Sequence, residues 1–393
     1  MSRLNDLIQQ YCPDGVEFKK IKEVYQRIKG TPITAGKMKE IQCPDGEIRI
    51  FAGGKTVIDA NEADIPNANI TRVPAVLVQS RGVIDAIYYD KPFTFKNEMW
   101  AYTHKEQTSV KFLYYVMKQN IQHFRDAASG MGALPQISLG TTEDFSIPVP
   151  PLPVQEEIVR ILDSFTELQA KLQVELQKRL QQYNYYRDNL LSFEGRTDVE
   201  WKKLGDVCLK VCSGGTPSRG NSGYFTGDIP WLRTQEVDWK DIYDTEIKIT
   251  EDAVKNSSAK LIPENCVIIA MYGATAGKVG INKIPLTTNQ ACCNLQINPQ
   301  KALYKYVYYW VCNEYEHLKS LGQGSQNNIN AQIIKEYPIP IPPLAEQQRI
   351  VSILDRFNAL TTDITAGLPA EIEARRKQYE YYRDQLLTFK QKA

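Results

Sequence analysis

The segment GATAGKV (Gly273–Val279) is the part of this sequence that comes closest to a phosphate-binding loop. Loops of the GxxxxGK[ST] type hold phosphates with backbone N–H groups and a lysine, and they hold magnesium with the final hydroxyl. Here one residue too few separates the two glycines, and Val279 replaces the hydroxyl residue. We therefore expect no nucleotide site, but a turn after a strand that brings Thr275 and Lys278 to a surface.

Other residues that could support catalysis form no recognisable pattern. PDGVEFK (Pro13–Lys19) imitates a PD…ExK nuclease motif, but its two acidic residues are close together at a turn, where a metal pair needs a strand between them. The histidines, His104, His123 and His317, have no cysteine or acidic residue at triad or metal-ligand spacing. There is no dinucleotide fingerprint, and no Asn-Pro-Pro-aromatic stretch suited to methylating a base amino group. The sequence predicts a non-catalytic chain that itself binds no metal or cofactor.

The remaining candidates are polar side chains in glycine-containing loops, such as SGGTPSRGNSGYF, PWLRTQE, TTNQA and GQGSQNNIN in the second half of the chain and AGGKT, SRG and KNEMW in the first. Asn, Gln and Arg can pair bidentately with base edges, and glycine lets the backbone approach phosphate. The alternative is that these are ordinary solvated loops. The predicted DNA-binding residues are Lys55, Arg81, Lys96, Asn97, Arg219, Arg233, Thr275, Lys278, Asn289, Gln290, Gln326, Asn327 and Asn328.

Length and composition set limits on the type of protein. A chain of 393 residues is too long for one core, so two domains are expected. The net charge of +1 argues against non-specific electrostatic binding to DNA, but it permits base reading by a few side chains. No run of eighteen apolar residues and no signal-peptide core is present. The eight cysteines include no CxxC pair, and Cys266, Cys292 and Cys293 are expected to be buried reduced thiols of a cytoplasmic protein.

The chain contains an internal repeat. IPVPPLPVQEEIVRILDSF (Ile147–Phe165) recurs as IPIPPLAEQQRIVSILDRF (Ile339–Phe357) with 12 of 19 positions identical. RLQQYNYYRDNLLSF (Arg179–Phe193) recurs as RRKQYEYYRDQLLTF (Arg375–Phe389) with 10 of 15 positions identical. Each copy opens with VE-aromatic-KK, whereas the globular middles, about 25–145 and 208–337, have diverged. The pattern suggests one task performed on two different targets, and plain duplication with drift is the alternative.

The conserved ends of the repeat predict long helices. After each proline pair the apolar residues alternate in steps of four and three, which is typical of helices that pack side by side. About 40 helical residues make a rod of about 60 Å. Only EGRTDVE separates the first helix from the second domain, so the second helix must return antiparallel and hold two heads at the ends of a dumbbell. Four extra residues near Gly367 keep the pattern in phase as a stutter, and Pro369 is expected to kink or break this helix.

The fold class predicted is α/β, with two α/β domains separated by an antiparallel pair of long coiled-coil helices and related by a pseudo-twofold repeat. Strands are expected at EIRIFAG, AVLVQS, DAIYYD and NCVIIAMYG, and helices at SVKFLYYVMKQNIQHF and ALYKYVYYWVCNEYEHLKSL. The predicted boundaries place a first globular domain at 1–150, a helix at 151–194, a second globular domain at 195–342 and a second helix at 343–393.

Over nearly its whole length the sequence resembles the specificity subunits of type I restriction-modification systems. The motifs that carry this resemblance are PPLAEQQRIVSILDRF, GLPAEIEARRKQYEYYRDQLLTF, GGTPSRG, IPWLRTQEV, SSAKLIPENCVIIAMYGATAGKVGI and TTNQA, whereas the first domain matches less closely in its middle. The resemblance implies two target-recognition domains, each reading one half of a bipartite asymmetric site in double-stranded DNA. Two alternatives remain open, namely an enzyme with an unrecognised active site and a coiled-coil scaffold that reads no DNA.

The resemblance also implies partners that supply the chemistry. The helices are expected to set the spacing of the half-sites and to dock two methylation subunits, which bring S-adenosylmethionine and methylate adenine. Motor-nuclease subunits, with ATP and Mg, are expected to cleave unmodified DNA. The helix residues predicted to dock these partners are Ile158, Leu162, Phe165, Tyr183, Tyr186, Ile350, Leu354, Phe357, Tyr379 and Tyr382.

Overall fold

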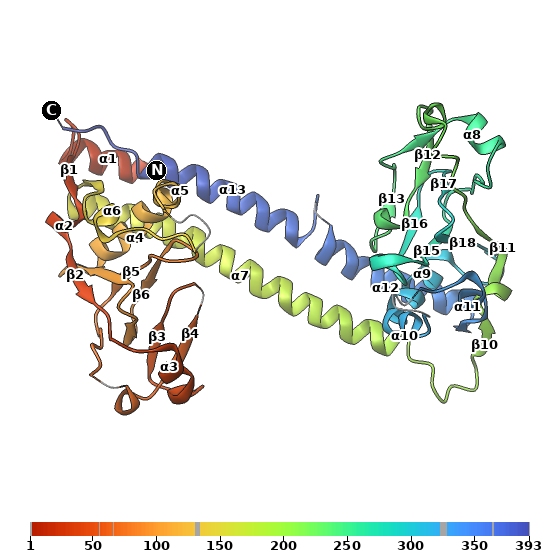
Figure 1. Ribbon diagram of the computed structural model, residues 1–393, viewed down its shortest axis with the longest axis horizontal. Helices are drawn as coiled ribbons and strands as arrows, with labels where there is room; N and C mark the ends of the chain where they lie inside the picture. Colours follow the sequence, from red (N-terminus) through yellow and green to blue (C-terminus); the bar gives the residue numbers. More distant parts are fainter. Residues whose placement is uncertain are drawn as a thin grey trace. The chain divides into compact units, whose positions relative to one another are not determined.

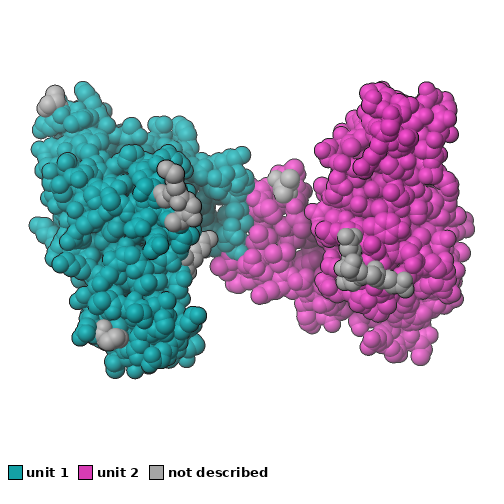
Figure 2. Space-filling view, in the orientation of Figure 1, with its two compact units in different colours: residues 1–173, 371–393 teal, residues 174–370 magenta. Residues whose placement is uncertain are grey.

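The chain forms two compact units (Figures 1 and 2): unit 1 comprises residues 1–173 and 371–393, and unit 2 comprises residues 174–370. The computed structural model describes residues 2–54, 56–65, 67–129, 134–322, 328–363 and 365–392. The long helix α7 (Leu152–Leu190) contributes its first part to unit 1 and its second part to unit 2. Both copies of the repeat therefore contribute to each unit.

Unit 1 contains two sheets and a strand pair. The larger sheet has the order β2-β8-β5-β6 and comprises β2 (Gln26–Lys29), β8 (Trp100–Thr103), β5 (Ala75–Gln79) and β6 (Asp85–Tyr89). The smaller sheet has the order β4-β3-β7 and comprises β4 (Val57–Ala60), β3 (Ile48–Phe51) and β7 (Phe93–Phe95). The strand pair joins β1 (Glu17–Lys20) to β9 (Ser146–Val149). Strands β3, β5 and β6 confirm three of the predicted strands.

Unit 1 also contains helices, which are α1 (Ser2–Tyr11), α2 (Ile21–Val24), α3 (Ala35–Ile41), η1 (Glu62–Asp64), α4 (Gln107–Gln119), α5 (Ile121–Asp126) and α6 (Leu139–Glu143). Of these, α4 packs on β5, β6 and β8 of the larger sheet. The single helix predicted through SVKFLYYVMKQNIQHF is wrong in one respect, because the structure divides it at Asn120. The Asn120 side-chain amide and backbone N–H both donate to the Val116 carbonyl, at 2.8 and 3.1 Å, and this local cap ends α4.

Unit 2 repeats this plan. Its sheets have the orders β11-β18-β15-β16-β13 and β14-β12-β17, and β10 pairs with β19. The strands are β10 (Glu200–Lys203), β11 (Cys208–Ser213), β12 (Ile229–Leu232), β13 (Asp241–Ile242), β14 (Lys248–Ile249), β15 (Val267–Ala270), β16 (Val279–Asn282), β17 (Thr287–Thr288), β18 (Cys292–Ile297) and β19 (Pro338–Ile341). The helices are η2 (Leu204–Val207), η3 (Ser222–Phe225), η4 (Thr234–Glu236), α8 (Glu251–Lys255), η5 (Gly273–Thr275), α9 (Tyr304–Asn313), α10 (Tyr315–Ser320) and α11 (Ala331–Glu336). β15 confirms the predicted strand, and the predicted second helix is again divided, at Glu314.

The hydrogen bonds align the two globular domains residue by residue. β3 runs parallel to β7 with Phe51 opposite Phe95, and β12 runs parallel to β17 with Leu232 opposite Thr288. Gly30 and Gly214 also correspond, because a Cβ at either position would collide with the carbonyl oxygen of Phe95 or Thr288. The diverged middles of the repeat therefore keep one common fold.

The repeated tyrosine phrase packs on the opposite copy of the repeat. In unit 1, α13 (Leu368–Leu386) runs antiparallel to the first part of α7, and the ring of Tyr382 stacks on Phe165 with centroids 5.4 Å apart. In unit 2, α12 (Leu344–Thr362) packs on the second part of α7, and Tyr186 stacks on Phe357, also at 5.4 Å. These antiparallel pairs, the two α/β domains and the repeat confirm the predicted fold class.

The ends of both phrases complete the cores. Leu191 and Phe193 are buried in the core of unit 2, and Leu386 and Leu387 are buried in the core of unit 1. Beyond α13, the Val16 N–H donates to the Lys390 carbonyl at 2.9 Å, and the Lys392 N–H donates back to Val16 at 2.9 Å. Unit 1 is thus closed by residues from the far end of the sequence.

A break separates α12 from α13. Asp363 Oδ1 accepts from the Thr365 N–H at 2.7 Å and from the Ala366 N–H at 3.2 Å, so a local turn ends α12. Pro369 then lies in the first turn of α13, where a missing N–H costs no hydrogen bond. The predicted break is confirmed just before Pro369, and a turn replaces the predicted stutter.

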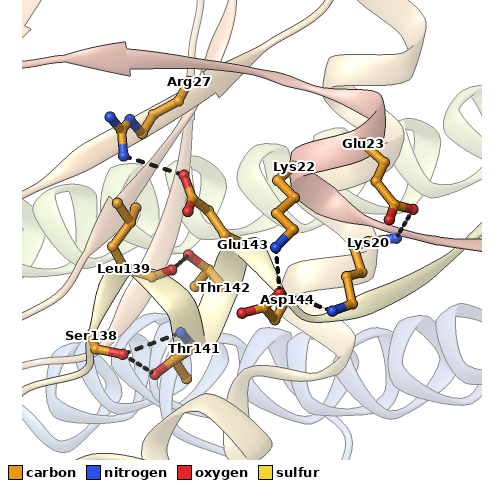
Figure 3. A network of polar contacts seen from close by, with 10 residues as sticks. All are labelled: Lys20, Lys22, Glu23, Arg27, Ser138, Leu139, Thr141, Thr142, Glu143 and Asp144. Atoms are coloured by element: carbon orange, nitrogen blue, oxygen red, sulfur yellow. Dashed lines mark hydrogen bonds and ion pairs between the residues drawn. The ribbon is translucent and has the colours of Figure 1, made fainter.

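Two lysines at the end of β1 and in α2 form exposed ion pairs with the segment before β9 (Figure 3). Lys20 and Lys22 both reach Asp144, at 3.0 and 2.7 Å, and they lower the pKa of this carboxyl, with Lys22 having the larger effect. In unit 2, Lys203 pairs in the same way with Glu336. These cations are therefore engaged in joining the opening strand of each repeat to the segment before β9 or β19.

All eight cysteines are free, and Cys266, Cys292 and Cys293 are buried as predicted. In the part of the chain that the structure describes, no helix combines the length and apolar character needed to cross a membrane. No group of three His, Cys, Asp or Glu side chains that could hold a metal is found among these residues.

Candidate nucleic-acid interface

The loops that follow three strands of unit 1 lie together. We call residues 52–54 after β3, 80–83 after β5 and 96–98 after β7 the unit 1 loop cluster. Parallel β3 and β7 end at one edge, where the Lys96 N–H donates to the Phe51 carbonyl at 3.0 Å. The Gly54 N–H donates to the Arg81 carbonyl at 3.1 Å and links the loop after β5. The structure thus brings together Arg81, Lys96 and Asn97, which the sequence predicted to bind DNA.

Two grooves flank Glu98 in this cluster. Asn97 and Glu98 line a polar groove of about 670 Å³. Arg81, Lys96 and Glu98 line a second groove of about 900 Å³. Lys96 Nζ lies 3.0 Å from Glu98 Oε1, whereas Arg81 is exposed and has no ion-pair partner among the residues described. In the unit 1 loop cluster the charge of Lys96 is therefore balanced by Glu98, whereas no carboxylate among the described residues balances the charge of Arg81.

The equivalent loops of unit 2 also meet. We call residues 233–236 after β12, 271–275 after β15 and 289–290 after β17 the unit 2 loop cluster. The Asn289 N–H donates to the Leu232 carbonyl at 2.9 Å, which matches the bond from Lys96 to Phe51 in unit 1. The Thr275 hydroxyl donates to the Thr234 carbonyl at 3.0 Å.

Most predicted residues of unit 2 converge on this cluster. Asn328 Oδ1 accepts from the Gly273 N–H at 3.2 Å, and the Gln290 side chain accepts a hydrogen bond from Thr216. The structure therefore places Arg233, Thr275, Asn289 and Gln290 in this cluster and Asn328 against it, whereas Arg219 and Lys278 lie outside these loops. Whether these side chains contact DNA stays a prediction.

Arg233 is held by two carboxylates. Its guanidinium forms an ion pair with Glu246, and its Nε lies 3.5 Å from Glu236 Oε1 without forming a hydrogen bond. Glu236 is itself fixed, because its side chain accepts the N–H groups of Arg233 and Glu246 at 3.1 and 2.8 Å. The arginine is thus pre-positioned in the first turn after β12.

Other polar groups near this arginine differ in how well they are satisfied. Asn289 Oδ1 is buried and has no hydrogen-bond partner among the described atoms, an arrangement that costs free energy. Lys278 Nζ lies 2.6 Å from Asp238, so its charge is balanced in the free protein. Arg219 is exposed in the loop that starts at Gly215, whose N–H donates to the Thr288 carbonyl at 2.9 Å.

The turn expected from GATAGKV is confirmed. It follows β15 and contains η5, and the side chains of Thr275 and Lys278 are half-buried. Lys55, Gln326 and Asn327 lie outside the described residues, so their predicted roles are not tested.

The helix residues predicted to dock partners fall into two groups. Ile158, Leu162, Ile350 and Leu354 have completely buried side chains that attach each helix to its own domain, so they offer no surface to a partner. The others pack where the helices meet, and docking through them stays a prediction. They are Phe165, Tyr183, Tyr186, Phe357, Tyr379 and Tyr382. The most exposed tyrosines of the repeated phrases are Tyr185 and Tyr381, at 65% and 62%.

Sequence reasoning missed the carboxylates that balance the predicted cations. Asp238 lies 40 residues before Lys278 in the sequence and only the fold pairs them, whereas Glu98 follows Lys96 by two residues and was visible beside it. Glu246 was not, because only the pairing of β12 with β14 brings it beside Arg233.

A family model and two relatives that this chain resembles all belong to the same protein family. The family model described as the type I restriction modification DNA specificity domain matches residues 13–182 and 197–374, which correspond to the two copies of the repeat. The type I restriction enzyme EcoR124I/EcoR124II specificity subunit of Escherichia coli is 41% identical over 296 residues, covering 72% of each chain. A putative type I restriction enzyme specificity subunit of Haemophilus influenzae is 34% identical over 317 residues, covering 74% of this chain and 77% of that protein.

Solved structures share the fold. The S subunit of a type I restriction-modification system from M. genitalium aligns over 95% of both chains with a TM-score of 0.58 and 17% identity. A chain from a study titled as the structural basis of complex assembly and conformational transition of the type I R-M system aligns with a TM-score of 0.55 and 16% identity, over 95% of this chain and 98% of that chain.

Proposed function

This chain belongs to the type I restriction modification DNA specificity family, and we propose that it reads a bipartite DNA sequence, with the loop cluster of each unit binding one half. The observation that carries this proposal is that equivalent positions in one fold hold different side chains. Lys96 of unit 1 corresponds to Asn289 of unit 2, and Asn97 corresponds to Gln290. A common scaffold with different polar groups is what two readers of different base sequences require.

The near-neutral net charge fits this role. Phosphate contacts supply most non-specific affinity for DNA, and their strength rises with the number of unbalanced cations. In this chain Lys96, Arg233 and Lys278 each face a carboxylate. The loop clusters are thus suited to selecting bases, while partner subunits supply further phosphate contacts.

The partners and cofactors follow from the family. Relatives are named specificity subunits of type I restriction enzymes, so we assign this chain a non-catalytic role in a larger cytoplasmic complex. Two methylation subunits dock on the long helices and bring S-adenosylmethionine, and motor-nuclease subunits bring ATP and Mg. The helices set the distance between the two half-sites. No observation on the described residues favours a scaffold that reads no DNA.

A domain exchange tests this proposal. Residues 25–145 are replaced by the matching part of another family member, and the methylated motif is determined by single-molecule sequencing of host DNA with the partner subunits present. One half of the motif should change and the other half should stay the same. A change in both halves, or in neither, refutes the assignment of one reader to each unit.

A further inference from the structure

The second groove of the unit 1 loop cluster has an apolar wall. Val57, Val83 and Leu134 line it and are 42%, 40% and 62% exposed, and Met38 and Ile58 lie beside them. We call the groove lined by Val57, Ile58, Val83 and Leu134, with the buried Met38 beneath them, the apolar groove. Apolar side chains that gather on a surface beside polar residues are candidates for a binding site.

The core of unit 1 does not need these exposed side chains. The neighbouring Ile48 and Ile50 of β3 are already completely buried in a core with Ile33 and Ile41. Val57 lies in β4 opposite Phe51, but its side chain faces solvent. Its exposure is therefore not a consequence of how the core of unit 1 packs.

The rim of the apolar groove is basic. Lys39, Arg81 and Lys96 line it, and Glu98 is the only acidic residue of the lining among the described residues. Since Glu98 pairs with Lys96, the charge left over is positive. A positive rim favours a polyanion over an apolar protein surface, because a nucleic acid would satisfy Lys39 and Arg81 with phosphate or base acceptors.

Glycine gives a ligand close access to this rim. Gly54 and Gly82 have φ values of 74° and 79°, and a Cβ on Gly82 would lie 3.4 Å from Gly54 Cα. The loops that contain Gly54 and Gly82 therefore approach each other closely, and no side chain covers the backbone at these two positions beside Arg81. Such bare backbone permits the close approach of a base edge.

Unit 2 has an ion pair at the corresponding place. Continuing the β12–β14 register by two residues places Glu246 opposite Leu232, as Val57 lies opposite Phe51. Arg233, which follows Leu232, pairs with Glu246. The same position of the fold is thus apolar in unit 1 and charged in unit 2.

We propose that the apolar groove recognises the C5 methyl group of a thymine in the half-site bound by unit 1. This inference rests on the function proposed above. Among the standard bases, only thymine presents an apolar group in the major groove, and its methyl is read by apolar side chains. The basic rim holds the DNA while Val57 and Val83 enclose the methyl.

Deoxyuridine provides the test, because it differs from thymine only by lacking this methyl. The complete methyltransferase complex is used, and the half-site of unit 1 is identified by the domain exchange. Each thymine of that half-site, on both strands, is replaced in turn, and the dissociation constant of each duplex is measured at fixed salt. At one position we expect about fourfold weaker binding, the effect of losing one buried methyl group.

Two variants assign this effect to the groove. The double variant Val57→Ala, Val83→Ala should bind thymine and deoxyuridine duplexes within twofold of each other. Val73→Ala is the matched control. Val73 is 49% exposed in the same unit, but it lies before β5, whereas Arg81 and the groove lie after β5. This control should keep the fourfold preference. Thermal melting of the three proteins checks that each retains its fold.

Several outcomes overturn the inference. Half-site-specific binding with no effect of deoxyuridine, or an unchanged preference in the double variant, refutes the groove assignment and leaves the proposed function standing. Loss of a partner subunit from the double variant, with the thymine preference intact, identifies the groove as a protein-docking site instead. Binding with no sequence preference at all refutes the proposed function itself.

Discussion

Replacing Arg233 by alanine tests whether the unit 2 loop cluster reads a base. Lost bidentate contact between an arginine and a guanine costs about 1–3 kcal/mol, or roughly 5- to 150-fold in affinity. Arg233 is the residue chosen for this test, because Glu236 and Glu246 fix its guanidinium at the end of β12 in the unit 2 loop cluster. We expect Arg233→Ala to lower affinity for the cognate duplex within this range.

The stability of unit 2 should change far less. Glu246 is 72% exposed, and an ion pair with such a partner contributes about 1 kcal/mol or less. Glu236 keeps two backbone N–H donors when the guanidinium is removed. The melting temperature should therefore fall by no more than about 4 °C, so that a loss of affinity cannot be attributed to unfolding.

The assay compares the cognate duplex with duplexes substituted at each base pair of the half-site, at several salt concentrations. If Arg233 reads a base, Arg233→Ala loses affinity for the cognate duplex and little for duplexes already changed at that base. A contact to phosphate behaves differently, since losing it weakens all duplexes alike and reduces the salt dependence by about 0.9. If Arg233→Ala lowered the affinity for all duplexes by the same factor, base reading by Arg233 would be refuted.

Three further predictions concern the helices. Glu157→Gln should lower unfolding free energy by about 1 kcal/mol at neutral pH, because Arg160 is exposed, and should flatten the acid side of the pH–stability curve. The Arg160 hydrogen bonds hold the Glu157 pKa below its ordinary value, so the wild-type protein loses this stability as the pH falls through the lowered pKa. Equal acid sensitivity of the wild-type protein and Glu157→Gln would contradict the reasoning. Phe165→Ala should speed amide hydrogen exchange in unit 1, and Phe357→Ala should speed it in unit 2, each lowering the unfolding free energy by about 2 kcal/mol. If both variants speeded exchange in the same unit, the reciprocal stacking would be contradicted. Four residues inserted after Lys171 lengthen α7 by about 6 Å and should widen the gap in the methylated motif by one or two base pairs, and an unchanged gap at full activity would show that another element sets the distance.

The sequence was most informative where it repeats. Identical motifs such as ILD and YYRD marked the helices and their antiparallel pairing, because apolar spacing and connectivity leave few other arrangements. Strands rich in Val, Ile and Tyr, such as β5 and β6, were equally visible. The helix breaks at Asn120 and Glu314 were missed, since both residues are compatible with a helix and only their backbone ψ angles of 16° and 9° depart from it.

The candidate interface could be predicted only in part. Side chains in loops just after strands were found, because polar residues beside glycine are conspicuous in sequence. The apolar groove was not, because Val57, Val83 and Leu134 come from separate segments and each resembles an ordinary core residue. The Arg233–Glu246 pair was hidden for the same reason, since strand pairing rather than sequence distance creates it.

The exchange of helix ends between the repeats has a consequence for biosynthesis. Unit 2 is one continuous stretch, residues 174–370, whereas unit 1 also requires residues 371–392. At a translation rate of about 5–20 residues per second, roughly 10 to 40 s separate the synthesis of its first part from that of its last.

During this interval the nascent first domain lacks Leu386 and Leu387, which belong to the same core as Ile158 and Leu162. Domains usually fold in the order in which they leave the ribosome. Here the order is reversed, because the unit begun first is completed last. Until Leu386 and Leu387 are synthesised, the apolar residues that pack against them in unit 1 are therefore expected to be the part of the nascent chain that chaperones bind.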